Sequence, residues 1–261
     1  MRAIINAATC DPVDFATTRT PEHLGDDYWY EQKMDGDRVL VQVEDGLISV
    51  FNRNAEPRSR FIPVRVDAPG TWIIDGEWMD DGTYWAFDLP VMNGQIVKHT
   101  LRDRRFILED FLHRVEHSPN MRILPKWEGE KKKLQLVQEV HSLSLEGVVI
   151  KHVAGTYGTR WLKAKNYHTA DVVVTSLRDD GKENVTFAVI SGTGEWKEVG
   201  RCALLGTEIA VGDVVEVRYL YMSKKGRLIQ PTLQRRRDDK TARECDMRQF
   251  STINKLVLGV P

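Results

Sequence analysis

The sequence Glu31-Gln32-Lys33-Met34-Asp35-Gly36-Asp37-Arg38 connects two runs that have the composition of β-strands. Aromatic residues 28–30 precede it and the β-branched alternation of residues 39–43 follows it, which favours strands on both sides. Because Asp-Gly is a strong turn signal between such runs, the pattern predicts a hairpin. Lys33 then lies at the end of a rigid strand, where a reactive side chain is well positioned. An exposed hairpin with solvated charges has the same local sequence, so a function for Lys33 depends on residues elsewhere in the chain.

The composition argues against several classes of protein. The 261 residues suffice for one large core or two unequal cores, and no apolar run approaches the roughly 20 residues that cross a bilayer. The N-terminus lacks the pattern of a signal peptide, so we expect a location in the cytoplasm, or in the host cytoplasm for a phage-encoded chain. The three cysteines, Cys10, Cys202 and Cys245, are far apart, which argues against a disulfide framework and a structural zinc site.

Apolar patterns in the first two-thirds of the chain predict an α+β arrangement. A strand over residues 71–78 is expected to pair with an antiparallel strand over residues 84–89 after an Asp-Asp-Gly turn. Helical spacing of apolar residues predicts helices over residues 101–115 and 128–141. Further strands are expected at residues 47–51, 145–151 and 159–165.

The composition changes after residue 168. Five short β-rich runs then alternate with Gly, Asp and Ser turns, which predicts a small all-β barrel or sandwich. We therefore expect a first domain of residues 1–168 and a second domain of residues 171–261. The net charge of the chain is only −1, but residues 218–248 hold ten Lys/Arg and four Asp/Glu. This local excess of positive charge is typical of a nucleic-acid-binding surface.

Several polar or aromatic residues lie where predicted strands begin or end. Glu77 and Glu146 border apolar strands; such carboxylates usually cap turns or meet solvent, but two that converge on one cleft would bind Mg²⁺ together with substrate phosphates. Lys163 and Lys165 alternate along a strand and point to the same face, either as a solvent-facing stripe or as a clamp on a phosphate. Phe87 is suited to a core position or to stacking on a base. The sequence has no G-x-x-x-x-G-K-[ST] phosphate-binding loop.

The order of these sites is similar to that of a known family. The motifs are Lys33-Met34-Asp35-Gly36-Asp37-Arg38, Asn52-Arg53-Asn54, Asp75-Gly76-Glu77, Phe87-Asp88, Glu146-Gly147-Val148-Val149-Ile150-Lys151, Trp161-Leu162-Lys163-Ala164-Lys165 and the segment 231–240. With them the chain resembles the ATP-dependent DNA ligases of the small two-domain type found in phages, viruses and bacteria. These enzymes belong to the covalent nucleotidyltransferase superfamily, which also holds RNA ligases and mRNA-capping enzymes.

The resemblance implies a fold and an activity. The implied fold is an antiparallel-sheet nucleotidyltransferase domain, similar to ATP-grasp ligases, followed by a small OB-fold barrel. The implied enzyme is a DNA ligase that seals nicks through a covalent lysyl–AMP intermediate, adenylyl transfer to the 5′-phosphate and attack by the 3′-hydroxyl. ATP would be the co-substrate, Mg²⁺ or Mn²⁺ the metal, and nicked double-stranded DNA the partner. We expect a monomer without membrane association.

The resemblance also assigns roles to residues by their positions in the motifs. Lys33 would be the nucleophile, and Glu77 and Glu146 would hold the metal. The residues that would contact the nucleotide or the DNA 5′-phosphate are Glu31, Arg38, Arg53, Glu77, Phe87, Glu146, Lys163 and Lys165. The residues that would orient the departing pyrophosphate are Arg235, Arg237, Asp239 and Lys240.

Two motif positions depart from the family pattern. Gln32 stands where proline is common before the lysine, and Asn52 stands where serine or threonine often precedes the arginine. Three unclustered cysteines disfavour an NAD⁺-dependent ligase, which carries a four-cysteine zinc finger. An RNA ligase, a capping guanylyltransferase and a non-catalytic OB-fold nucleic-acid binder stay open as alternatives. Replication, repair and recombination all stay open as the biological setting. It is also open whether another protein loads the chain on DNA.

Overall fold

The chain forms two compact units in the computed structural model. The first unit contains residues 1–142, 146–165 and 255–261, and the second contains residues 143–145 and 166–254. The division at residue 166 lies close to the predicted boundary, whereas residues 255–261, expected in the second domain, group with the first unit. The residues that the structure describes are 5–13, 25–59, 65–66, 69–113, 115–116, 120–179, 183–204, 206 and 208–259.

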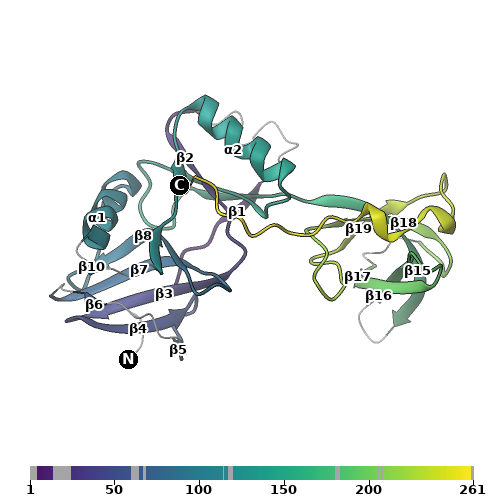
Figure 1. The fold of residues 1–261 in the computed structure, drawn as a ribbon, viewed down its shortest axis with the longest axis horizontal. Helices are drawn as coiled ribbons and strands as arrows, with labels where there is room; N and C mark the ends of the chain where they lie inside the picture. The colour runs from purple at the N-terminus through teal and green to yellow at the C-terminus, as the bar shows by residue number, and fades with distance from the viewer. Residues whose placement is uncertain are drawn as a thin grey trace. The chain divides into compact units, whose positions relative to one another are not determined.

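The larger sheet of the first unit has seven strands (Figure 1). The predicted antiparallel pairing of residues 71–78 with residues 84–89 is confirmed, because Gly76 lies opposite Ala86. In sheet order the strands are β11 (Met121–Ile123), β8 (Tyr84–Met92), β7 (Thr71–Trp78), β3 (Asp37–Glu44), β4 (Leu47–Asn52) and β5 (Pro57–Arg58), with β9 (Gln95–Ile96) paired to β8. Only β11 runs parallel to its neighbour.

Helix α1 (Leu101–His113) packs on one face of this sheet. The Thr100 hydroxyl accepts a hydrogen bond from the Asp103 N–H, which satisfies one free donor of the first turn. Leu108 and Phe111 are buried against the sheet. Burial of each such side chain stabilises the fold by about 1.5–3 kcal/mol. The predicted helix is too long at its end: residue 115 lies in β10 (Val115–Glu116), which pairs with β6 (Arg65–Val66).

The second sheet of the first unit corrects the predicted hairpin. Its strands, in order, are β1 (Asp11–Val13), β14 (Trp161–Lys165), β13 (Gly147–His152), β2 (Tyr28–Gln32) and β12 (Lys126–Trp127). Strand β2 therefore pairs with β13 and β12, while β3 belongs to the other sheet. The Asp35-Gly36 sequence lies in the segment that connects β2 of this sheet to β3 of the other sheet. A Cβ atom on Gly36 would lie 2.5 Å from the carbonyl oxygen of Trp78, so close backbone approach explains this glycine.

Helix α2 (Glu130–Ser142) packs against the second sheet and confirms the second predicted helix to within two residues at its start. Leu136, Val137 and Val140 form its buried face, spaced as an amphipathic helix requires. Lys133 is also buried, and its Nζ donates a hydrogen bond to the carbonyl oxygen of Gly25. In its described residues the first unit therefore combines mostly antiparallel sheets with two helices, as the α+β prediction states.

The second unit is a five-stranded antiparallel sheet over a core of valines, Phe187 and Tyr219. Irregular positions in its ladders, as between Val174 and Ser176, bend the strands. In the described ranges no ladder closes the sheet from its first to its last strand, so the small all-β unit is confirmed and the OB-fold barrel stays a prediction. The strands, in sheet order, are β17 (Trp196–Ala203), β16 (Glu183–Ile190), β15 (His168–Asp179), β18 (Val214–Tyr219) and β19 (Thr232–Arg236).

No helix in the described parts of the chain is long and apolar enough to cross a bilayer.

Candidate active site

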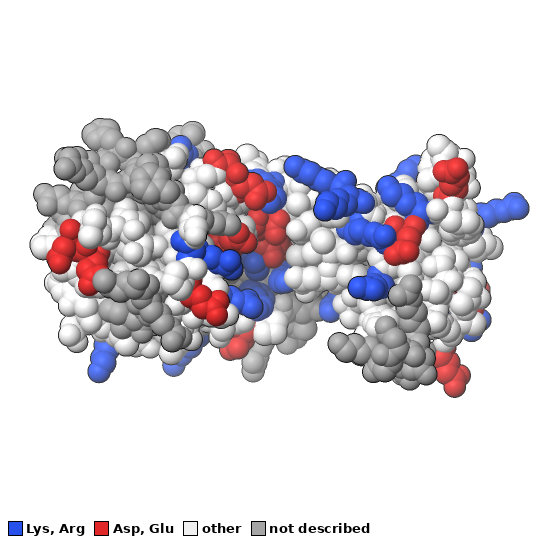
Figure 2. Space-filling model, turned by 90° about the horizontal axis from the view of Figure 1, so that it is seen from below, with Lys and Arg blue, Asp and Glu red and all other residues white. Residues whose placement is uncertain are grey.

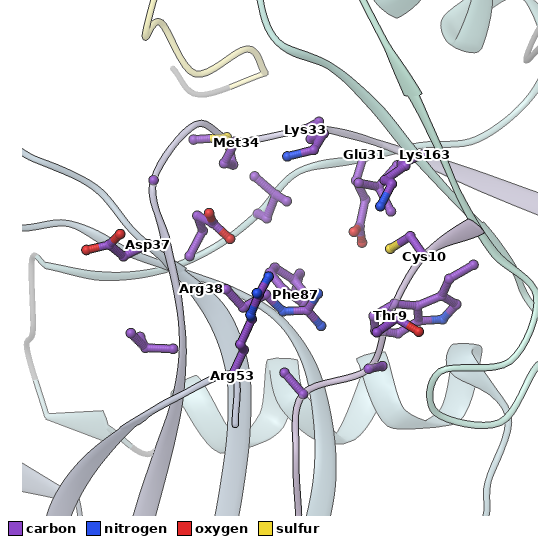
Figure 3. A pocket seen from close by; sticks show the side chains of 18 of the residues that line it. Thr9, Cys10, Glu31, Lys33, Met34, Asp37, Arg38, Arg53, Phe87 and Lys163 are labelled. Carbon is purple, nitrogen blue, oxygen red and sulfur yellow. The ribbon is translucent and has the colours of Figure 1, made fainter. Parts of the chain in front are cut away.

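A cavity of about 950 Å³ lies between the two sheets of the first unit (Figure 3). Strand β2 and the crossing after it line one side, and β3, β7 and β8 contribute residues from the larger sheet. Seven of the predicted site residues line this cavity: Glu31, Lys33, Arg38, Arg53, Glu77, Phe87 and Lys163. The crossing from β2 to β3 is therefore what brings residues of both sheets to one place.

Lys33 is held at the end of β2 by backbone and side-chain contacts. Its N–H donates to the carbonyl oxygen of Gly147 at 2.8 Å, and its Nζ lies 2.8 Å from Glu146 Oε2. Gly147 has φ 151°, and a Cβ atom on it would lie 2.1 Å from the Ala164 carbonyl oxygen. Only glycine therefore fits where β13 approaches β14, and this close approach places the Glu146 carboxylate beside the Lys33 amine.

Glu77 and Glu146 are buried carboxylates whose ionised forms are disfavoured. Burial raises the pKa of Glu77 to about 7, although the nearby charges of Lys33 and Arg38 oppose the shift. Burial likewise raises the pKa of Glu146, again against the charge of Lys33. Glu146 adds to the shift of Glu77, so the two carboxylates lie within electrostatic range of each other. A cation between them would relieve both costs.

The donor set fits a magnesium ion that also binds phosphates. Among the described residues no group of three His, Cys, Asp or Glu side chains could hold a metal by itself. Mg²⁺ usually takes one or two protein carboxylates, substrate phosphates and water. Glu77 and Glu146 would supply two carboxylates, and substrate phosphates and water would supply the remaining ligands.

Arg38 is locked into a buried network that the motif pattern does not reveal. Its guanidinium donates to both oxygens of Asp75, at 2.9 and 2.5 Å, and these contacts keep its pKa above the ordinary value despite burial. Tyr157 donates its hydroxyl to Asp75 at 2.5 Å and accepts a hydrogen bond from the Ala8 N–H. Residues 75 and 77 lie on the same face of a strand, so the sequence carries a signal that Asp75 belongs to the site with Glu77. No pattern in the sequence marks Tyr157 as a site residue.

Glu31 is buried in an ion-pair cluster behind Phe87. Its carboxylate lies 2.6 Å from Lys151 Nζ and 3.2 Å from Arg105. The Lys151 Nζ lies 4.3 Å from the centre of the Phe87 ring, and the Arg38 guanidinium lies 4.9 Å from it. The ring is thus held by two cations at the cavity. Lys151 ends one of the motifs but had no role assigned to it, and Arg105 lies in none of the motifs.

Lys163 and Lys165 lie on β14, opposite Val149 and Gly147 of β13. Lys163 lines the cavity, and in Figure 3 its amine points into it. Burial lowers the pKa of Lys165, as do the charges of Lys33 and Lys163, while Glu146 raises it. Lys165 therefore lies within electrostatic range of Lys33, Lys163 and Glu146, and the clamp on a phosphate stays a prediction.

Asp88 follows Phe87 in its motif but faces the opposite side of the strand. It accepts hydrogen bonds from Arg104 of α1 at 2.8 and 2.9 Å, and both side chains are fully buried. Arg104 also donates to the carbonyl oxygens of His99 and Gly155. Asp88 therefore fixes α1 to the sheet, and Phe87 is the member of this motif that reaches the cavity.

The four predicted pyrophosphate residues lie in the second unit. Arg237 pairs with Asp171 at 3.0 Å and with Asp239 at 2.8 Å, and Lys240 also pairs with Asp171. The pKa of Asp239 lies below its ordinary value because Arg237 donates hydrogen bonds to it. Arg235 pairs with Glu216. Several Lys and Arg side chains lie on the face of this unit that Figure 2 shows.

Residues 75–165 match the family model described as the ATP dependent DNA ligase domain. This matched segment is about a third of the chain. It contains Glu77, Phe87, Glu146 and Lys163 of the site. The DNA ligases of Monkeypox virus and of Vaccinia virus (strain Western Reserve) are each 22% identical over 248 residues, which cover 76% of this chain and 44% of the relative. The chain thus spans less than half the length of these relatives.

The fold of the chain is similar to solved structures. A Lig E DNA ligase, described as binding DNA "with a minimal scaffold", has a TM-score of 0.63, 17% identity and coverage of 90% of this chain and 100% of its own. The structure called Pmar-Lig_PreS3 has a TM-score of 0.70, 19% identity and coverage of 90% and 68%. At such identities the likeness concerns the fold alone.

Proposed function

We propose that the chain is an ATP-dependent DNA ligase that seals nicks in duplex DNA. The observation that carries this proposal is the Lys33 amine, 2.8 Å from Glu146 Oε2 at a cavity that also holds Glu77, Arg38 and Lys163. The ATP-dependent ligase family accounts for a nucleophilic lysine among such groups. Nicked double-stranded DNA is the proposed partner, and the viral relatives are named DNA ligases.

The proposed first step joins AMP to Lys33. The neutral amine of Lys33 attacks the α-phosphorus of ATP, the bond from that phosphorus to the bridging oxygen breaks, and pyrophosphate leaves with its electron pair. The amine loses a proton as the P–N bond forms. The carboxylate of Glu146 receives a hydrogen bond from this amine, and its raised pKa makes it a better proton acceptor than an ordinary carboxylate.

Two further transfers complete the proposed reaction. An oxygen of the DNA 5′-phosphate attacks the AMP phosphorus, the P–N bond breaks, and Lys33 regains a proton. The 3′-hydroxyl then attacks the activated 5′-phosphorus, loses its proton, and displaces AMP. Arg38, Lys163 and Lys165 supply positive charge for the phosphate oxygens in these steps, and Arg53 is assigned to the 5′-phosphate. Arginine suits such contacts through its two-pronged guanidinium.

Glu77 and Glu146 are proposed to hold a Mg²⁺ or Mn²⁺ ion. Such an ion, when bound, neutralises charge on the transferring phosphate. Phe87 is assigned to stacking on the adenine, which would contribute about 1–3 kcal/mol, and Glu31 to holding the nucleotide. We also propose that the second unit is an OB-fold domain whose Arg235, Arg237, Asp239 and Lys240 orient the pyrophosphate. Its network around Asp171 supports this role, because the cations lie together.

A labelling experiment tests the proposal. The chain is incubated with Mg²⁺ and with α-labelled ATP, α-labelled GTP or adenylate-labelled NAD⁺, and then run on a denaturing gel. We expect label from ATP alone, lost in Lys33→Ala and kept in Lys98→Ala, which alters an exposed lysine of the same unit. Label from GTP alone would indicate a capping enzyme, and no label would indicate a binding module. A nicked DNA duplex compared with a nicked RNA then distinguishes a DNA from an RNA ligase.

A further inference from the structure

Residues 255–258 lie along the segment that carries Lys33. The side-chain amide of Gln32 donates from Nε2 to the carbonyl oxygen of Leu256 at 2.7 Å. Its Oε1 accepts from the N–H of Leu258 at 2.9 Å. Gln32 is only 3% exposed, and it uses its donor and its acceptor on one stretch of backbone. A side chain without an amide, such as leucine, could form neither contact.

Two further contacts join the same segments. Lys255 Nζ lies 2.8 Å from Asp80 Oδ2 and 3.7 Å from Asp35 Oδ2, and it donates to the Asp35 carbonyl oxygen at 3.3 Å. Val257 packs in the apolar cluster that contains Met34. Residues 255–258 therefore contact Asp35, after Lys33, and Gln32, just before it. The described end of the chain returns to β2 in Figure 1.

The position of Lys33 depends on such contacts because no hairpin holds it. After β2 the chain leaves one sheet and crosses to β3 in the other. One side of the crossing is fixed by the hydrogen bond from the Lys33 N–H to Gly147. Residues 255–258 add contacts to the side chain of Gln32 and to Asp35. Attack by an amine requires reacting atoms held about 3–3.5 Å apart in good alignment, so small displacements of this crossing would slow the reaction.

We propose that residues 255–258 position Lys33 for attack on the α-phosphorus, and that Gln32 is the positioning residue through which they act. This inference rests on the ligase function proposed above. It concerns only the step that forms a bond to Lys33. Sealing of a nick whose 5′-phosphate already carries AMP forms no such bond, so that reaction should not depend on Gln32 in the same way.

The test compares these two reactions in full-length variants. Gln32→Leu removes the amide at similar volume, and Gln32→Glu keeps the acceptor for Leu258 but loses the donor to Leu256. Gln95→Leu, at an exposed site in β9, is the matched control. The measurements are the single-turnover rate of AMP attachment at saturating ATP, the apparent KM for ATP, and the rate of sealing of a pre-adenylylated nick.

We expect AMP attachment in Gln32→Leu to slow by about tenfold, the factor that corresponds to about 1.4 kcal/mol. The KM for ATP and the sealing of the pre-adenylylated nick should stay within about twofold, as in the control. Gln32→Glu should be intermediate. Lys255→Ala, a surface change that should not unfold the chain, is expected to slow attachment by no more than about fivefold, because exposed ion pairs are weak.

Two results would overturn the inference while leaving the ligase function standing. One is AMP attachment at the unmodified rate in Gln32→Leu. The other is an equal loss in both reactions together with a lower Tm, which would mean that Gln32 serves only the stability of the fold. An unmodified chain that takes up no AMP would instead overturn the proposed function and this inference with it.

Discussion

The charged residues of the cavity and those of segment 235–240 differ in burial. Asp75 and the side chain of Glu31 are almost completely buried, and each is paired with two partners. Arg235 is 64% exposed and Lys240 is 32% exposed at their side chains. Breaking a buried pair costs about 3–5 kcal/mol because one charge is left without a partner, whereas an exposed pair contributes about 0–1 kcal/mol.

This difference suits the two proposed roles. In the first unit the network of Arg38, Asp75 and Tyr157 holds the cavity in one arrangement before a nucleotide binds, so little reorganisation is needed at the moment of reaction. In the second unit Lys240, whose side chain is 32% exposed, is paired with Asp171. This cation can exchange the carboxylate for a phosphate at a lower cost than a buried cation could.

The largest expected effect separates the two regions by function. Lys33→Ala should abolish AMP attachment because the reaction loses its nucleophile. Lys240→Ala should slow attachment by only about ten- to a hundredfold, since it removes one stabilising charge. The measurement is the initial rate of label transfer from α-labelled ATP. Attachment in Lys33→Ala above about a thousandth of the unmodified rate would show that another group is the nucleophile.

The next effect compares the regions by stability. Asp75→Asn should lower the free energy of unfolding by up to about 3–5 kcal/mol, because the change at this fully buried position leaves the Arg38 guanidinium without its countercharge. Asp239→Asn, at an exposed ion pair with Arg237, should change it by less than about 1 kcal/mol. Urea unfolding of both variants measures the difference. Equal losses would contradict the view that burial distinguishes the two networks.

Salt should affect DNA binding through the exposed region. If about three phosphate contacts come from exposed Lys and Arg, raising salt from about 50 to 200 mM should weaken nick affinity by about ten- to a hundredfold. Arg235→Ala should make this salt dependence shallower, whereas Arg105→Lys, within the buried cluster, should leave its slope unchanged. Fluorescence anisotropy of a labelled nicked duplex without ATP measures it. A nick affinity that does not change with salt would exclude the proposed phosphate contacts.

The smallest expected effect is on the pH dependence of the free energy of unfolding, which has opposite signs for Glu77 in the cavity and Asp239 in segment 235–240. Burial raises the pKa of Glu77 to about 7 from an ordinary 4.5, so the folded chain keeps a proton that the unfolded chain releases between these values. The stability contributed by this proton is present below pH 4.5 and is lost as the pH rises to about 7. Asp239, whose pKa is lowered, contributes stability that is lost as the pH falls.

Glu77→Gln should therefore raise the free energy of unfolding of the metal-free chain at pH 7.5 by about 1–2 kcal/mol and leave it unchanged at pH 4. Urea unfolding in the presence of a chelator measures both values. Asp239→Asn is the matched comparison, and its effect should appear at pH 7.5 and vanish toward acid pH. An equal effect of Glu77→Gln at both values would show that ionisation of Glu77 is not the cause.

The elements of the chain were largely predictable because they depend on local patterns. The antiparallel pairing of residues 71–78 with 84–89 and the helix over residues 130–142 follow from alternation and helical spacing. The prediction of a hairpin at Asp35-Gly36 was wrong, because a turn signal does not determine which strands pair. Pairing of β2 with β13 involves residues more than a hundred positions apart, and no local rule reaches that far.

The sequence by itself determined which chemical groups are present and in what order: a lysine before Asp-Gly, acids at strand ends, and two lysines on one face of a strand. Only the tertiary structure decided which of them meet. Lys33 reaches Glu146 because Gly147 lets two strands approach, and Arg38 is fixed by Asp75 and Tyr157. Residues 255–258 contact the segment around Lys33 although their sequence carries no motif. Such contacts depend on burial and on long-range strand pairing, which only the folded chain creates.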